Sequence, residues 1–191
     1  MGKTLTTRHL TIPPTYMETV GAVVFYWATL EHELVDLIGT AMRLDKKQRR
    51  ILMAHMDPKA KLAMLKVVAS KYVRMPDTRA KVINLGSACG ALYKARNLFA
   101  HGAWVHPSDN SSKYELLVIE SGEDAFLPRR MEMDDSGRAN LVAHFAQAVQ
   151  FANALIREVG AQVGPPQDAE GGEVTSESEP PESLVVPDEP H

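Results

Sequence analysis

Arg96, Asn97 and His101 stand close together near the middle of this 191-residue chain. Arginine is permanently charged and binds phosphate through a planar fork of N–H donors. Histidine gains and loses a proton near neutral pH, which suits it to general acid–base chemistry. The string Arg-Asn-Leu-Phe-Ala-His therefore holds the groups that a metal-free cleavage of a phosphodiester bond requires.

The element that positions these residues is a predicted helix that begins at Pro76 and ends at His101, with Gly102 as its stop. Arg96 falls on the apolar stripe of that helix. A charge in a packing seam needs a partner or a ligand, because desolvating it alone costs several kcal/mol. Glu31 on the first helix is the candidate partner. Two alternatives stay open: an internal Arg96–Glu31 ion pair, or an Arg96 held ready for phosphate.

The spacing of Arg96 and His101 bears on how many copies a site needs. Five residues at about 100° each place the two side chains about 140° apart around a helix. One copy is therefore expected to converge poorly on one phosphate. Two copies facing each other across a two-fold axis would clamp a strand from both sides, and such dimers are the commonest oligomers. We expect a homodimer.

The periodicity of apolar residues predicts an all-α fold, an up-down bundle of four to five helices with a small β-hairpin-like insertion before the last helix. A first helix of roughly 28 residues follows Pro13-Pro14, with Thr15 and Glu18 at capping-box spacing. The insertion is expected over 103–133, as three antiparallel strand-like segments.

Helix start signals divide the rest of the bundle. Asp45 can cap a short basic helix, and Asp57 followed by proline opens a helix that runs to about Arg74. Asp134 and Asp135 begin the last helix, whose apolar stripe continues to Val159.

Composition separates three regions: an N-terminal extension over 1–14, the bundle over 15–161 and a tail over 162–191. The tail holds eight acidic residues, six of the twelve prolines and no Lys or Arg. Such a composition cannot bury enough apolar area to offset the entropy of ordering, so we expect the tail to be disordered. It either only solubilises the protein or competes with RNA for the rest of the chain, since residues 1–161 carry five more basic than acidic residues.

Two further features indicate a cytoplasmic protein. Cys89 is the single cysteine, so no disulfide can form within the chain, as is typical of a reducing compartment. The longest apolar stretch, 20–30, is too short to span a bilayer, and the N-terminus lacks a signal-peptide pattern. We expect no contact with a membrane.

Arg96-Asn97 and His101-Gly102, at the end of a helix in an all-helical bundle, resemble the R-x4-H motif of the HEPN superfamily (higher eukaryotes and prokaryotes nucleotide-binding domain). The resemblance covers about residues 15–160. It implies a metal-independent endoribonuclease that needs no cofactor and cleaves RNA as a homodimer, leaving a 2′,3′-cyclic phosphate and a 5′-hydroxyl.

The resemblance also implies residue roles. His101 would be the general acid or base, Arg96 would stabilise charge on the phosphate, and Asn97 would orient His101 or the phosphate. Many members are toxins or antiphage-defence effectors, which implies a cognate antitoxin or another partner protein. Some family toxins carry a tyrosine two residues after the histidine, whereas this chain has Ala103, so regulation through that tyrosine is not expected.

A basic run is the remaining candidate for RNA contacts. It consists of Lys46, Lys47, Arg49 and Arg50. These side chains either follow an RNA backbone or form a solvated face.

The alternative to an enzyme is a non-catalytic HEPN-like protein that binds RNA or a nucleotide, or acts as a scaffold. A metal site is not expected, because no histidine has the spacing of a metal ligand.

Overall fold

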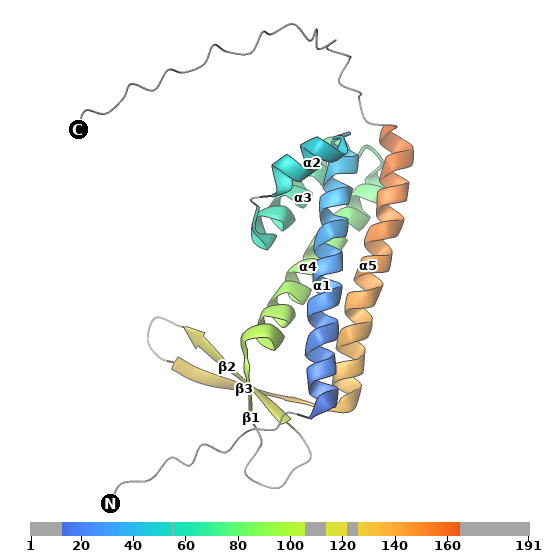
Figure 1. Ribbon diagram of the computed structural model, residues 1–191. Helices are drawn as coiled ribbons and strands as arrows, with labels where there is room; N and C mark the ends of the chain where they lie inside the picture. Colours follow the sequence, from blue (N-terminus) through green and yellow to red (C-terminus); the bar gives the residue numbers. More distant parts are fainter. Residues whose placement is uncertain (1–12, 55, 106–113, 122–125, 165–191) are drawn as a thin grey trace, which may run out of the picture.

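The computed structural model describes residues 13–54, 56–105, 114–121 and 126–164. In this part of the chain five helices form an elongated bundle, and a small sheet lies at one end of it (Figure 1). The predicted all-α bundle is therefore confirmed. The helices are α1 (Pro14–Ala41), α2 (Lys46–Met53), α3 (Pro58–Tyr72), α4 (Pro76–His101) and α5 (Asp135–Val163).

Three aspartates begin helices as predicted. Asp45 accepts a hydrogen bond from the backbone N–H of Gln48, whose side chain in turn accepts from the N–H of Asp45. Asp57 and Asp134 each accept from the third residue of their helix, at 2.8 and 2.7 Å. These bonds satisfy N–H groups that have no partner within the helix. Helix α3 ends two residues earlier than expected, at Tyr72.

The start of α1 differs from the prediction. Its N-cap is Pro13, and no side chain caps it, so the expected Thr15–Glu18 capping box is wrong. Pro14 occupies the first helical position, where its missing N–H costs nothing and its fixed φ suits the helix. Thr15 consequently lies inside the helix, and its carbonyl accepts a hydrogen bond from the Thr19 hydroxyl.

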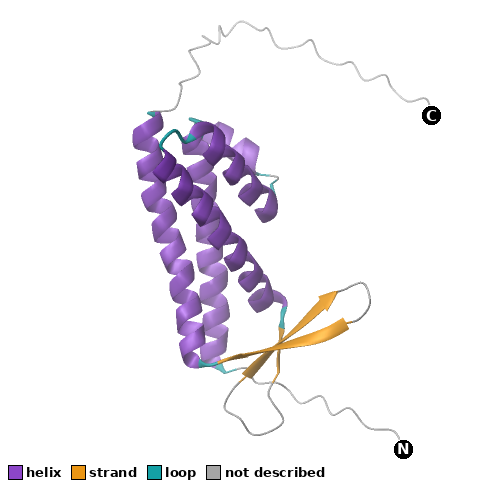
Figure 2. Ribbon diagram, turned by 180° about the vertical axis from the view of Figure 1, so that it is seen from behind, coloured by secondary structure: helices purple, strands orange, loops and turns teal. Residues whose placement is uncertain are grey.

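Helices α1 and α5 run parallel, side by side along their whole length (Figures 1 and 2). Near their starts, the Arg138 guanidinium stacks 3.8 Å from the centre of the Tyr16 ring. Near their ends, Gly160 faces Thr40, and an added Cβ would be in ordinary van der Waals contact with the threonine methyl, at 3.5 Å. Since α4 runs in the opposite direction, the chain alternates between up and down.

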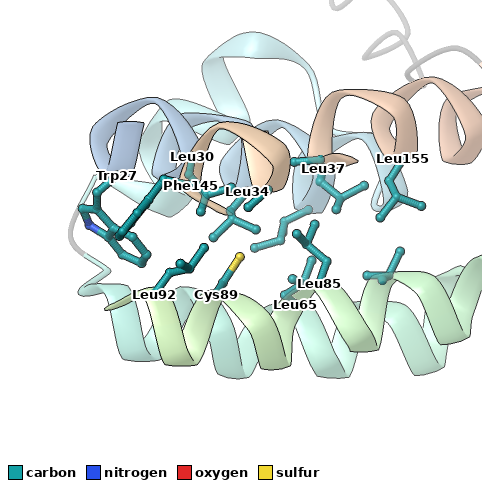
Figure 3. Close-up of a cluster of buried hydrophobic side chains, with 14 of the residues drawn as sticks. Trp27, Leu30, Leu34, Leu37, Leu65, Leu85, Cys89, Leu92, Phe145 and Leu155 are labelled. Carbon is teal, nitrogen blue, oxygen red and sulfur yellow. The ribbon is translucent and has the colours of Figure 1, made fainter. Parts of the chain in front are cut away.

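The core lies where the apolar stripes of these helices meet (Figure 3). Trp27 from α1, Leu92 from α4 and Phe145 from α5 pack around one end of it, and the Cys89 thiol lies among leucines. Each fully buried leucine or phenylalanine contributes roughly 1.5–3 kcal/mol. The apolar stripe predicted for α4 is thus one of the surfaces that hold the bundle together.

The expected insertion is a three-stranded antiparallel sheet of β1 (Ala103–Val105), β2 (Tyr114–Ser121) and β3 (Phe126–Met133), in the order β1-β2-β3. Trp104 pairs with Leu116, and Leu117 pairs with Arg130. Because β1 follows α4 directly and β3 leads into α5, the sheet connects the His101 end of α4 to the start of α5.

At the other end of the bundle, α5 continues to Val163, two residues past the expected end of the bundle at 161. Gln162 donates a hydrogen bond to the Thr78 hydroxyl, which explains the extra length. The rest of the tail, 165–191, and residues 1–12 of the N-terminal extension lie outside the described residues. Of the helices that the structure describes, none is both long and apolar enough to cross a membrane.

Candidate active site

The last turns of α4 place Arg96 between a half-buried residue and a buried one. Tyr93, one turn before it, packs its ring 5.4 Å from that of Trp27, and Phe99, one turn after it, is 2% exposed. The arginine stem therefore lies against the core, as its place on the apolar stripe predicts. Its Nε is buried and has no hydrogen-bond partner among the described residues.

The outer end of Arg96 reaches two polar neighbours. Nη1 donates a hydrogen bond of 3.0 Å to Oδ1 of Asn97 and lies 3.5 Å from Nε2 of His101. The expectation that one copy holds the two side chains too far apart is wrong. The 140° separation describes where the side chains leave the helix, whereas the long arginine stem bends along the surface to the exposed imidazole of the last turn.

The contact with His101 can be a hydrogen bond in only one tautomer of the ring. Arginine has donors only, so a hydrogen bond from Nη1 needs an unprotonated Nε2 and places the ring hydrogen on Nδ1. A distance of 3.5 Å is the long limit for a hydrogen bond. The contact therefore keeps the guanidinium and the imidazole next to each other but is weak enough to be broken when a substrate binds. Asn97 holds the guanidinium, in place of the histidine or phosphate that the resemblance implied.

Glu31 does not pair with Arg96. Its Oε1 accepts a hydrogen bond of 2.7 Å from Nζ of Lys61 on α3. The side chains of this pair are 26% and 14% exposed, respectively. No carboxylate pairs with Arg96 in the described part of the chain, so the alternative of an internal Arg96–Glu31 ion pair is not realised.

Lys61 is the residue that sequence reasoning missed. It lies four residues before Leu65 and seven before Val68, both of which are buried. This spacing places Lys61 on the inward stripe of α3, and the same rule that singled out Arg96 would have found it.

The basic run on α2 lies far from His101. Helix α2 packs beside the end of α1, whereas α4 ends beside the sheet at the opposite end of the bundle (Figure 1). Arg49 covers Gly39 and donates to the Leu44 carbonyl and to Asp36, so its guanidinium serves the fold. The other three members, Lys46, Lys47 and Arg50, are exposed.

Comparisons with family models, with curated proteins and with solved structures returned no match. Among the described residues, no three His, Cys, Asp or Glu side chains are grouped so that they could hold a metal ion.

Proposed function

We propose that this protein is a metal-independent endoribonuclease of the HEPN type, with Arg96 and His101 as its catalytic residues. The observation that carries the proposal is the contact of Arg96 Nη1 with His101 Nε2 at 3.5 Å, at an exposed helix end. The resemblance of the Arg-Asn-Leu-Phe-Ala-His string to the R-x4-H motif supplies the reaction class.

The environment of Arg96 supports a role in binding phosphate. A half-buried guanidinium with no carboxylate partner in the described part of the chain, and with a buried Nε that makes no hydrogen bond, is costly to the fold. Phosphate oxygens would supply the missing acceptors through charge-assisted hydrogen bonds. Arg96 should therefore contribute more free energy to the binding of an anionic substrate than a fully exposed arginine would.

The proposed reaction begins when His101 Nε2 takes the proton of a ribose 2′-hydroxyl. The 2′-oxygen then attacks the adjacent phosphorus, and the bond to the 5′-oxygen breaks. A proton delivered to that oxygen gives a 5′-hydroxyl and a 2′,3′-cyclic phosphate. Arg96 leaves Nε2 when the phosphate binds, which frees Nε2 for this proton, and Arg96 then donates to the phosphate oxygens as charge builds on them. Asn97 Oδ1 keeps the guanidinium in place.

The proposal includes a homodimer acting on RNA. The reaction removes one proton and delivers another, and a second copy of His101 across a two-fold axis would provide the second group. A single copy already holds Arg96 beside His101, so the dimer is needed for this second proton transfer and for gripping the strand. Light scattering on the purified protein measures the oligomeric state.

In the cell, we place the protein in the cytoplasm as a toxin or antiphage-defence effector held in check by a cognate antitoxin or another partner protein. The second candidate is a non-catalytic HEPN-like protein that binds RNA or a nucleotide, or scaffolds a partner. The 3.5 Å contact favours this second candidate if Nε2 of His101 stays hydrogen-bonded to Arg96 when RNA binds, because Nε2 then cannot take a proton from the substrate.

The test is incubation of the full-length protein with RNA, followed by analysis of the new ends. We expect 2′,3′-cyclic phosphate ends in the presence of EDTA. Arg96→Ala and His101→Ala should each abolish cleavage while the protein stays folded. Arg157→Ala and His144→Ala are the matched controls, because both residues are exposed on α5, and they should cut normally.

Two outcomes decide against the proposal. Loss of cleavage in EDTA would exclude the metal-free mechanism. RNA binding without cleavage, weakened by Arg96→Ala, would support the non-catalytic candidate.

A further inference from the structure

An open apolar groove of about 500 Å³ lies between α4 and α5, two helices that diverge toward the sheet (Figures 1 and 2). The side chains of Leu85, Leu92 and Ala148 are buried and form its floor. Phe151 stands at its rim and is 40% exposed. Apolar surface therefore faces solvent here, and nothing in the described part of the chain covers it.

The groove is too small to hold two folded proteins together. Nine of the described residues line it, three of them polar. A stable interface takes roughly 20–30 residues from each partner. An occupant of this groove must therefore be short and apolar, and something other than a large contact area must bring it there.

The chain beyond Gly164 contains one such segment, Leu184-Val185-Val186. Apart from Ala169 and Val174, the other residues of 165–191 are polar, charged, glycine or proline. A proline follows Val186 and favours an extended backbone at that valine, which suits a segment lying in a groove. A solubilising role accounts for the acidic residues of the tail but not for three consecutive branched apolar side chains.

The length of the tail matches the distance to the groove. Phe151 precedes Gly164 by thirteen residues, about 20 Å along the axis of α5. Leu184 follows Gly164 by twenty residues, and a flexible chain of that length has a root-mean-square span of roughly 22–27 Å. A linker whose span equals the separation gives the highest effective concentration, in the millimolar range. A contact that would be weak between separate molecules is therefore favourable within one chain.

We propose that the Leu184-Val185-Val186 run of the tail docks in the groove between α4 and α5 of the same chain. Its side chains cover the apolar floor, while the acidic residues on either side of the run stay in water. The tail is thereby held along the side of the bundle. The proposal does not depend on the ribonuclease activity, because neither Arg96 nor His101 lines the groove.

Disulfide trapping in the full-length protein tests this contact. Ser183→Cys, beside the apolar run, is combined with Ala88→Cys, at an exposed position in the groove. The matched control combines Ser183→Cys with Ser87→Cys, which is also exposed but lies about 100° around α4 and outside the groove. Under mild oxidation of dilute protein, we expect the disulfide within one chain to form at least about tenfold faster in the groove pair. Cys89 does not compete, because it is fully buried.

Two further variants of the groove pair test the chemistry of the contact. Val185→Asp should lower the rate to that of the control pair, because an apolar groove does not accommodate a carboxylate. Val185→Ile keeps an apolar side chain and should leave the rate within about twofold. Equal rates in the two cysteine pairs, or no effect of Val185→Asp, would overturn the proposal. Disulfides that form mainly between two chains would also overturn it, because the groove would then take the tail of a second copy.

Discussion

Lys61 Nζ lies 2.7 Å from Glu31 Oε1, between α3 and the middle of α1, in a pair that is largely covered by the bundle. Arg96 therefore has no carboxylate partner in the described part of the chain, although its position on the packing stripe predicted one. Glu31 pairs with Lys61 inside the bundle, whereas the guanidinium of Arg96 lies beside Asn97 and His101 at the exposed end of α4. The structural ion pair and the proposed catalytic arginine therefore do not share a partner.

A double-mutant cycle on Glu31 and Lys61 tests this assignment. Glu31→Gln and Lys61→Met should show a coupling energy of about 0.5–1 kcal/mol in urea unfolding, because the pair is partly screened by solvent. The parallel cycle of Glu31→Gln with Arg96→Met should show none beyond experimental error. Comparable coupling in both cycles would mean that Glu31 also holds Arg96.

Replacing Arg96 by methionine should stabilise the fold. The apolar stem is kept, while the buried Nε that lacks a partner in the described structure is removed. We expect the free energy of unfolding to rise by about 1 kcal/mol, as at other functional positions that carry an uncompensated polar group. Urea denaturation provides the measurement, and a loss of 1 kcal/mol or more would show that the fold needs the guanidinium.

Replacement of Gly39 and of Gly90 by alanine should change the stability of the fold in opposite directions. A Cβ at Gly39 would overlap the Arg49 side chain, whereas nothing lies within 4 Å of a Cβ at Gly90. Gly39→Ala should cost about 1–3 kcal/mol because Arg49 must leave its hydrogen bonds. Gly90→Ala should gain about 0.5–1 kcal/mol from the stiffer helix. Melting curves of both variants would reveal the contrast, and equal shifts would contradict it.

Glu158 should make stability depend on pH in the acid range. Its carboxylate accepts hydrogen bonds from the Thr78 hydroxyl and from Lys81, and these contacts lower the pKa of Glu158. The stabilisation is thus present above the ordinary glutamate pKa of roughly 4.3 and is lost as the pH falls through the lower value of the folded protein.

Unfolding in urea at a series of pH values measures this dependence. Glu158→Gln should flatten the decline below about pH 4.3. The control is Glu18→Gln, at an exposed position on α1, which should leave the decline unchanged. An identical acid-side slope in the Glu158→Gln variant and the unaltered protein would contradict the assignment.

Ending the chain after Gly164 should raise its affinity for RNA at low salt. The removed segment holds eight acidic residues and no Lys or Arg. Electrostatic competition of this kind is screened by salt, so the gain should vanish at about 1 M. Fluorescence anisotropy with a labelled RNA measures it, and an unchanged affinity at low salt would leave the tail only a solubilising role.

Local signals in the sequence predicted most of the fold. Aspartates before helices accept hydrogen bonds from the first turn, and the proline that opens α4 has a φ already suited to the helix, so their effect can be read without knowing the rest of the structure. The start of α1 was misjudged because Pro14 and Thr15 each carry a start signal, and the proline prevails.

The contacts within the site were harder to predict, because the direction in which a side chain leaves a helix does not determine where its end group lies. The position of Arg96 on the stripe was correct, yet its approach to His101 depends on a long flexible stem crossing the helix surface. The pairing of Glu31 with Lys61 depends on how far α3 slides along α1, which no local pattern specifies.

The single thiol of this chain has a kinetic consequence. Cys89 is fully buried in the core, and burial raises its pKa to about 12, so the folded protein should not react with thiol reagents. Each labelling event must then follow an opening of the bundle between α1, α4 and α5. The rate of modification would therefore measure how often the core opens under native conditions, and no cysteine has to be engineered into the protein for this purpose.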